Sequence, residues 1–212
     1  MIRFLREKDG CLFISKPQGI ESEKQLPQLI FAQSGIKVWP VHRLDKETGG
    51  VMVLAESAES AARLSRLMQK VSAQKEYLCI CEGYWEEKEG ELTDFLYHDR
   101  NRNKTYTVKS ERKGVKKAEL SYTVLSEKDG YSLVSIKLKT GRTHQIRVQF
   151  ASRRHPLKND RRYGSKTTGA IALWACELLL DNTLSCRDWP EETEEPWVLF
   201  QKELEERKRE KR

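Results

Sequence analysis

Residues 41–55 read Val-His-Arg-Leu-Asp-Lys-Glu-Thr-Gly-Gly-Val-Met-Val-Leu-Ala. A charged segment leads through two adjacent glycines into a run, Val51 to Ala55, that is apolar at every position. Such a run is typical of a strand that is buried on both faces. The charged segment places a carboxylate, Asp45, between Arg43 and Lys46. Because a buried strand holds the adjoining loop in place, loops of this kind often carry catalytic groups, and Asp45 is the first candidate for a reactive residue.

The length and charge of the chain favour a folded protein with an anionic partner. The 212 residues suffice for one large domain, which we predict for residues 1–200, followed by a charged tail at 201–212. A net charge of +7 favours nucleic acid or a membrane surface. No apolar run approaches the roughly 18 residues needed to span a bilayer, and the tail has only Leu204 as a large apolar residue. We therefore expect a cytoplasmic protein without membrane contact.

The cysteines and histidines do not form a recognisable metal-binding pattern. Five cysteines are an odd number, and none shows CxxC spacing, so we interpret them as reduced thiols. Cys79 and Cys81 lie two apart in a strand-like run and are interpreted as small core residues. His42 and His144 stand in unlike contexts, where a hydrogen-bonding role is favoured over metal binding. We expect no metal site.

Hydrophobic periodicity and turn residues predict an alternation of strands and helices. Apolar positions at spacings of three and four, with Ser57 as N-cap, predict a helix that reaches Val71. Thr143 is the predicted cap of a further helix, whose residues also alternate as a strand would. The acidic segment 86–91 is interpreted as a solvated turn. The predicted strands are 3–14 (a hairpin), 51–55, 74–85, 118–125, 131–138 and 171–180, and the predicted helices are 21–35, 57–71, 144–152 and the tail.

Two segments are strongly basic. Residues 100–117 hold eight lysines and arginines against one acid, with Tyr106 among them, and residues 153–166 are also basic. A basic segment with an aromatic residue can hold a phosphate backbone and stack a base. A solvated hairpin is the alternative interpretation of 100–117.

Two further residues could act together with Asp45, since an aspartate between cations on a loop is by itself more often a salt-bridged surface residue. Arg142 follows a glycine just past a predicted strand, and its planar guanidinium could pair with a carboxylate or a phosphate. Tyr77 could offer a stacking face and a hydroxyl group, or it could be a core aromatic residue. The His-Arg-Leu-Asp sequence is faintly similar to the catalytic loop of protein kinases, but no glycine-rich phosphate loop precedes it here and no asparagine follows at the required spacing.

Several segments, in chain order, carry a resemblance to a known family. They are Lys16-Pro17-x-Gly19, His42-Arg43-Leu44-Asp45-Lys46-Glu47-Thr48-Gly49-Gly50, Lys75-x-Tyr77 with Gly83, Gly141-Arg142-Thr143-His144-Gln145-Ile146-Arg147, and Pro156-Leu157 with Asp160 and Tyr163-Gly164. Together they resemble the motifs of the RluA-type RNA pseudouridine synthases over about residues 8–180. Three positions depart from the family pattern: Gly49 replaces a serine, Asn159 a glycine, and Trp174 a residue that is often histidine.

The resemblance implies an α+β fold, the pseudouridine synthase fold, with a mixed, mainly antiparallel central sheet and flanking helices. A separate N-terminal S4 domain is not expected. The implied reaction isomerises uridine in ribosomal or transfer RNA to pseudouridine without a cofactor or metal. The alternative is a non-catalytic RNA-binding or ribosome-assembly factor on the same fold, and we expect a monomer in either case.

The resemblance also implies residue roles. Asp45 would be the nucleophile, on a path through either attack on the sugar or a glycal. Arg142 would pair with Asp45 and help to displace the target base, and Tyr77 would stack on the flipped uracil and could act as a general base. A base inside a helix is out of reach, so flipping is required. The expected substrate and RNA contacts are His42, Arg43, Lys104, Lys116, His144, Ile146, Arg147, Arg153 and Arg154.

Overall fold

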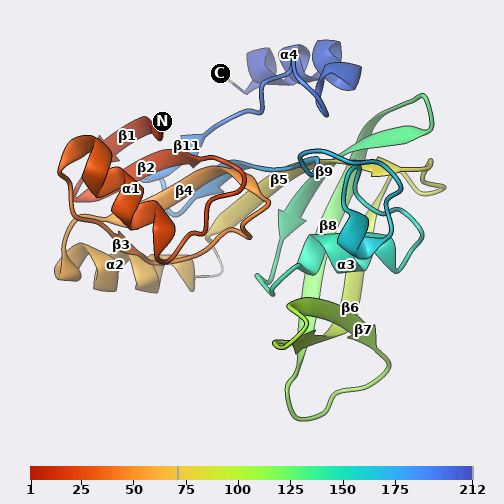
Figure 1. The fold of residues 1–212 in the computed structure, drawn as a ribbon, viewed down its shortest axis with the longest axis horizontal. Coiled ribbons are helices and arrows are strands. Elements are labelled where there is room, and N and C mark those ends of the chain that lie inside the picture. Colours follow the sequence, from red (N-terminus) through yellow and green to blue (C-terminus); the bar gives the residue numbers. More distant parts are fainter. Residues whose placement is uncertain (71, 212) are drawn as a thin grey trace. The chain divides into compact units, whose positions relative to one another are not determined.

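The computed structural model describes residues 1–70 and 72–211, and it has an α+β fold (Figure 1). The contacts among its residues divide the chain into two compact units. Unit 1 comprises Met1–Glu76 and Trp174–Pro190, and unit 2 comprises Tyr77–Leu173 and Glu191–Arg212. The chain therefore crosses from one unit to the other three times: within β5 (Gln74–Glu82), at the start of β10 (Leu173–Leu179), and between Pro190 and Glu191.

Unit 1 contains a sheet with the strand order β1-β2-β4-β10. The predicted hairpin is confirmed as β1 (Arg3–Lys8) and β2 (Cys11–Lys16), and its turn residues Asp9 and Gly10 have φ angles of 52° and 67°, as a tight type I′ turn requires. β4 (Gly49–Ala55) is buried along its whole length, as predicted. It pairs antiparallel with β2 and parallel with β10. The short β3 (Trp39–Pro40) pairs antiparallel with β4, and β11 (Ser185–Arg187) pairs antiparallel with β10.

Two helices complete unit 1. α1 (Gln25–Ser34) ends at Gly35, which has a left-handed φ of 74°. α2 (Ala58–Met68) begins with a capping box in which the Ser57 and Ser60 side chains each accept a hydrogen bond from the other residue's backbone N–H. Leu64 of α2 packs into a core formed by strands β2, β4 and the end of β10. Both helices are confirmed, and Val71, the predicted end of the second, lies outside the described residues.

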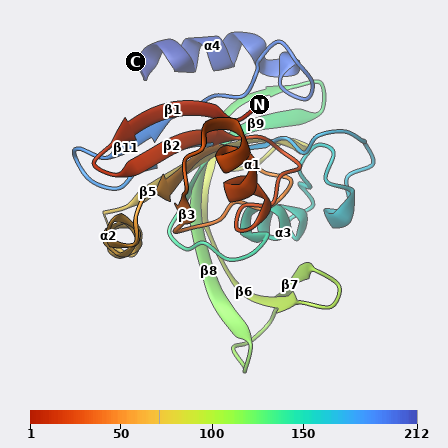
Figure 2. The same ribbon diagram turned by 60° about the vertical axis from the view of Figure 1, so that its left-hand side comes forward.

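Unit 2 is built on long antiparallel strands. β9 (Tyr131–Leu138), β8 (Val115–Lys128), β6 (Glu89–Asp99) and β7 (Lys104–Val108) follow each other in the sheet, and β5 pairs with β9 (Figure 2). The predicted turn at Asp129-Gly130 is confirmed by left-handed φ angles of 51° and 81°. The solvated turn expected at 86–91 is wrong in its second half, because residues 89–91 pair with β8. With the parallel β4–β10 pair, these ladders confirm a mixed, mainly antiparallel sheet.

The helix predicted at 144–152 is confirmed as α3 (Gln145–Ala151), but its predicted cap is wrong. His144, with a left-handed φ of 54°, precedes the helix, and no side chain caps it. Instead the Gln145 side-chain oxygen accepts hydrogen bonds from the Arg142 N–H at 3.0 Å and from the Thr140 hydroxyl at 2.8 Å. Val148 then packs against β6, β8 and Tyr163 of the short helix η1 (Arg161–Tyr163).

The charged tail forms a helix, as predicted. α4 (Gln201–Glu210) follows the short helix η2 (Val198–Phe200), and its Leu204 side chain is fully buried. Glu203 accepts a hydrogen bond from the Ser126 hydroxyl at 3.0 Å, so the tail is fixed to unit 2 by both apolar and polar contacts. Within the described part of the chain, none of the helices is long and apolar enough to cross a membrane.

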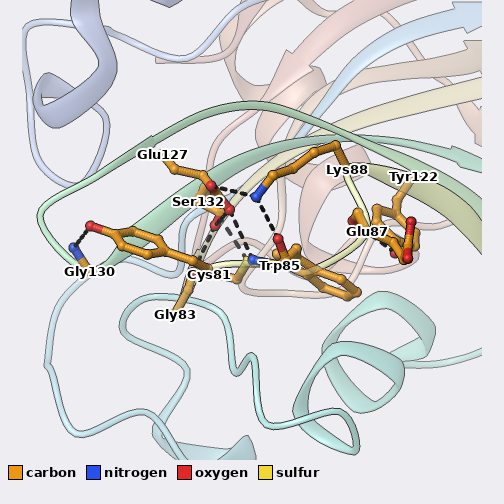
Figure 3. A network of polar contacts seen from close by, with 10 residues as sticks. Cys81, Gly83, Trp85, Glu87, Lys88, Tyr122, Glu127, Gly130 and Ser132 are labelled. Atoms are coloured by element: carbon orange, nitrogen blue, oxygen red, sulfur yellow. Dashed lines mark hydrogen bonds and ion pairs between the residues drawn. The ribbon is translucent and has the colours of Figure 1, made fainter.

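A polar network holds the segment that follows β5 to the β8–β9 hairpin (Figure 3). One oxygen of Glu127 accepts hydrogen bonds from the Trp85 N–H at 2.9 Å and the Ser132 hydroxyl at 3.1 Å, and the other pairs with Lys88 at 2.7 Å. The hydrogen bond from Lys88, followed by those from Trp85 and Ser132, lowers the pKa of Glu127 below its usual value. The ionised carboxylate is therefore the form that the fold favours.

We predict that Glu127→Gln destabilises the protein by about 1 kcal/mol at pH 7, because the isosteric amide keeps an acceptor but loses the charge. A carboxylate with a lowered folded-state pKa stabilises the fold above its ordinary pKa, and this contribution disappears as the pH falls through the folded-state value. The difference between variant and wild type should therefore shrink toward pH 3 in urea unfolding. Glu86→Gln, at an exposed neighbour, is the control, and an equal loss at pH 3 and pH 7 would contradict the prediction.

Candidate active site

The loop that carries Asp45 is fixed by backbone hydrogen bonds within unit 1. The Thr48 N–H donates to the Asp45 carbonyl at 3.0 Å, which closes a turn just before β4. The buried Ser22 hydroxyl donates to the Leu44 carbonyl at 2.7 Å and accepts from the Leu44 N–H at 3.2 Å. Leu44 itself is buried. The residues on both sides of Asp45 therefore hold its backbone in place.

A buried lysine also holds the loop that carries Asp45. The Lys16 ammonium is fully buried and donates to the carbonyls of Pro17 at 2.9 Å, Ile20 at 2.8 Å and Lys46 at 3.4 Å. Burial lowers the pKa of Lys16 to about 8, although the negative charge of Asp45 acts in the opposite direction. Lys16 therefore joins the N-terminal Lys-Pro motif to the loop of the candidate nucleophile and places a positive charge near it.

His42 and Arg43 were expected to contact RNA, and in this structure both support the loop. The Val53 N–H donates to Nε2 of His42 at 3.1 Å, which ties the loop to β4. Burial, with a smaller effect of the Lys75 charge, lowers the pKa of His42 to about 3, so the ring is neutral at physiological pH. Arg43 is exposed and pairs with the exposed Glu23 at 2.8 Å, which leaves it accessible to solvent.

The departures at Gly49 and Trp174 are parts of one packing arrangement. The two residues are partners in the parallel β4–β10 ladder. A Cβ added to Gly49 would lie 2.2 Å from the Trp174 ring, far inside van der Waals contact. At the next position, Gly50 has a φ of 114°, and a Cβ there would lie 2.2 Å from the Ala175 carbonyl oxygen. The indole of Trp174 thus occupies the space that a side chain at position 49 would need.

Tyr77 and Ile146 both lie in regular secondary structure of unit 2. Tyr77 lies in β5 and is 9% exposed, and Ile146 lies in the first turn of α3 and is 4% exposed. Cys79 and Cys81 are fully buried in the same strand as Tyr77, as expected for core residues. Both candidate base-contacting side chains therefore extend from regular secondary structure.

The two arginines of the Gly-Arg-Thr-His-Gln-Ile-Arg segment have opposite environments. Arg142 is exposed, and its Nε donates to the Lys117 carbonyl at 3.0 Å. Arg147 is 2% exposed, and two of its nitrogens donate to the Asp160 carboxylate at 2.6 and 2.9 Å. Its guanidinium also lies 5.2 Å from the centre of the Tyr163 ring. Arg147, which was expected to contact the substrate or RNA, therefore lies in a buried ion pair in this structure.

Three other residues that were expected to contact RNA interact with side chains of unit 2. His144 is buried, with Nδ1 2.9 Å from the Tyr163 hydroxyl, which favours a structural role. Arg153 pairs with Asp94 at 2.9 Å, and the Lys104 ammonium lies 5.5 Å from the Tyr163 ring centre. Arg154 is exposed. The burial and pairing of these cations depend on residues distant in sequence, and the basic composition alone does not reveal them.

A pocket of about 560 Å³ opens beside the basic segment of unit 2. It lies where β6, the β6–β7 turn, the start of β8 and the loop before α3 meet, and its lining includes Leu96, Tyr97, Arg100, Asn101, Lys116 and Arg142. The sequence interpretation included the cations but missed the pocket and Tyr97. Tyr97 comes shortly before the basic segment 100–117 in the sequence, and this proximity could have indicated that it lies beside the cations.

Asn159, the third departure from the family pattern, is compatible with the backbone that it occupies. Its φ is 70°, in the left-handed region that glycine adopts freely and asparagine tolerates. The side-chain amide donates to the Ala170 carbonyl at 2.8 Å, and the backbone N–H is within hydrogen-bonding distance of the Ser165 and Thr167 hydroxyls, at 3.1 Å each. Asparagine therefore keeps the turn next to Asp160 and fastens the following loop.

Comparisons with known proteins agree with the motifs. A model of the family described as RNA pseudouridylate synthase matches residues 11–152. An uncharacterised RNA pseudouridine synthase of Bacillus subtilis is 35% identical over 187 residues, which cover 81% of this chain and 61% of the relative. The ribosomal large subunit pseudouridine synthase C of Buchnera aphidicola (from Acyrthosiphon pisum) is 31% identical over 184 residues, which cover 79% of this chain and 56% of the relative.

A solved structure shows the same fold. Human RNA pseudouridylate synthase domain containing 1 superimposes with a TM-score of 0.80 and 20% sequence identity, covering 93% of this chain and 86% of that chain. The chain spans about half the length of the first curated relatives that it matches.

Lys16→Met is predicted to destabilise the protein by about 2–4 kcal/mol at pH 7, because the carbonyls of the loop lose their shared donor. The exposed Lys46 supplies the matched control, Lys46→Met. Since the folded-state pKa of about 8 lies below the ordinary 10.5, the unfolded state binds more protons between these values. The stability of the wild type should then rise relative to Lys16→Met from pH 8 to 10.5 in urea unfolding, and equal stability of the two lysine variants would contradict the role of Lys16.

Gly49→Ser should destabilise the protein by about 1–3 kcal/mol, because its Cβ enters the space of the Trp174 ring. The double variant Gly49→Ser with Trp174→His should recover most of this loss, since the smaller ring vacates the space. A double-mutant cycle measured by chemical unfolding checks the coupling. Additive effects of the two substitutions would show that they do not share the space.

Proposed function

Because the chain belongs to the RNA pseudouridylate synthase family, we propose that it isomerises specific uridines in RNA to pseudouridine. The observation that carries the proposal is the fixed loop of Asp45, which hydrogen bonds hold on both sides and the buried Lys16 ammonium supports. Catalytic groups require this kind of preorganisation. The proposed catalytic domain spans residues 1–200, and the enzyme is proposed to be monomeric and cytoplasmic.

Asp45 is the proposed nucleophile. The reaction must break the bond from ribose C1′ to N1 of uracil, turn the base and form a bond from C1′ to C5. The proton on C5 is then lost, and N1 gains one, so the product is an isomer of the substrate. An ionised carboxylate can start this sequence by attacking C1′, or the base can depart through a glycal when a sugar proton is removed. The charge of Lys16 near Asp45 supports the ionised form in both cases.

Tyr77 and Ile146 are proposed to hold the uracil. The target base must leave its stack to reach the half-buried Asp45 carboxylate, and a flipped base needs an aromatic or apolar surface to replace its neighbours. Tyr77 offers a ring for stacking and a hydroxyl that could accept a sugar proton, and Ile146 offers an apolar contact. Their placement in β5 and in α3 supports a rigid site.

Two arginines are candidates for the partner of Asp45. The sequence motif led us to propose Arg142, which can also help to displace the base. Arg147 is the second candidate, because Asp160 and Tyr163 already hold its guanidinium in one orientation. A guanidinium held in this way loses little entropy when it binds a further carboxylate, and Arg142 would then serve the RNA alone.

The proposed substrate is ribosomal or transfer RNA. The name of the Buchnera aphidicola relative refers to the large ribosomal subunit, which supports ribosomal RNA. The exposed cations Arg100, Lys116 and Arg154 are proposed to contact phosphates, and such contacts position a protein on RNA without reading its bases.

Asp45→Asn is predicted to lower pseudouridine formation by at least about 10³-fold while RNA affinity stays within about threefold, because the amide keeps the shape and loses the nucleophile. The assay incubates the protein with RNA from a strain that lacks it and maps pseudouridine. Arg142→Ala in the same assay separates the two arginines: a loss of turnover supports pairing with Asp45, and a change in KM alone leaves that role to Arg147.

The non-catalytic alternative predicts a different result. An RNA-binding or ribosome-assembly factor would keep both its binding and its cellular phenotype in Asp45→Asn. If wild-type protein restores no pseudouridine, the proposed activity is wrong, and if Asp45→Asn retains full activity, the nucleophile is wrong.

A further inference from the structure

The pocket in unit 2 collects positive charge from three separate segments. Arg100 comes from the β6–β7 turn, Lys116 from β8, and Arg142 from the loop before α3. All three are exposed. Neither Arg100 nor Lys116 forms an ion pair within the described part of the chain. Cations that lie together without acidic partners repel one another, so this arrangement raises the affinity for an anion.

The carboxylate of Asp99 in the pocket lining does not cancel this charge. One of its oxygens accepts hydrogen bonds from the backbone N–H groups of Asn101 at 3.0 Å and Arg102 at 3.1 Å. The other lies 3.8 Å from Nε of Arg102. Asp99 is therefore engaged in shaping the β6–β7 turn, and its charge is balanced by Arg102 on the same turn.

The rest of the lining suits a ligand larger than a simple anion. Leu96 and Tyr97 contribute apolar surface, and Asn101 is an exposed amide at the rim. Thr105 is tied on both sides, since its hydroxyl donates to the Thr143 carbonyl at 2.8 Å and lies 3.0 Å from Nδ1 of His98. These two contacts therefore fix Thr105 in the lining of the pocket. A volume of about 560 Å³ is in the range of pockets that hold small molecules.

We infer that this pocket binds one nucleotide of the RNA strand, with its phosphate at Arg100 and Lys116 and its sugar and base against the apolar wall. The inference rests on the proposed function, because RNA is the ligand of that function. It goes further in assigning a discrete subsite in place of diffuse attraction by the basic surface. An acidic peptide would satisfy the cations but would not need the apolar surface of Leu96 and Tyr97 beside them, so a nucleotide is the better match.

The test separates pocket occupancy from surface charge. Asn101→Trp fills the rim without changing the charge, and Asn182→Trp, on an exposed turn of unit 1, is its control. Lys116→Gln removes a pocket charge, and Lys109→Gln removes an exposed charge of the same basic segment outside the pocket. Each substitution is made in full-length Asp45→Asn protein, so that binding is measured without turnover. The probe is a fluorescein-labelled single-stranded RNA of mixed sequence, titrated by fluorescence anisotropy at several KCl concentrations.

We expect Asn101→Trp to weaken binding at least about fivefold, and Lys116→Gln to lower the salt slope by about 0.7, the value for one phosphate contact on a single strand. The two controls should bind like the parent, and thermal unfolding should show that all four variants remain folded. The inference is overturned if the pocket variants bind like their controls, or if the parent does not bind the RNA at low salt.

The binding assay and the activity assay fail independently. If the pocket variants lose RNA affinity but the wild type forms no pseudouridine, the subsite stands and the proposed reaction is wrong. If pseudouridine forms and the pocket variants bind normally, the reaction stands and the subsite is wrong.

Discussion

The candidate active site depends on the hydrogen bonds from the buried Lys16 ammonium to the backbone around the Asp45 loop. A lysine without exposure to solvent is costly unless all its hydrogen bonds are made, and here three backbone carbonyls accept them. One of these carbonyls belongs to Lys46, next to Asp45. The Lys16 ammonium holds the backbone of this loop through its hydrogen bonds. Its positive charge also favours the ionised form of the Asp45 carboxylate. Loop geometry and electrostatics therefore have one physical origin.

Unit 2 contains a comparable constraint in the Arg147–Asp160 ion pair. Both side chains are buried, and the pair is bidentate, so removing either partner would leave an uncompensated charge. The pair fixes α3 to the segment that contains η1. Arg142, only five positions earlier in the sequence, remains exposed at the edge of a pocket. One motif thus supplies a buried arginine and an accessible one.

The departures from the family pattern preserve the local geometry. Glycine at position 49 and tryptophan at position 174 complement each other in volume. Asn159 occupies a left-handed position that glycine would also tolerate, and it adds a hydrogen bond from its side chain.

The sequence by itself determined the features that depend on neighbouring residues. The Asp-Gly turns, the Ser57 cap, the apolar β4 and the order of the motifs are local, so spacing and residue type were sufficient to predict them. Only the tertiary structure decided which charged side chains are buried or paired. Arg147 meets Asp160 across 13 positions and Arg153 meets Asp94 across 59, and a chain pattern cannot predict contacts that arise when distant segments pack together.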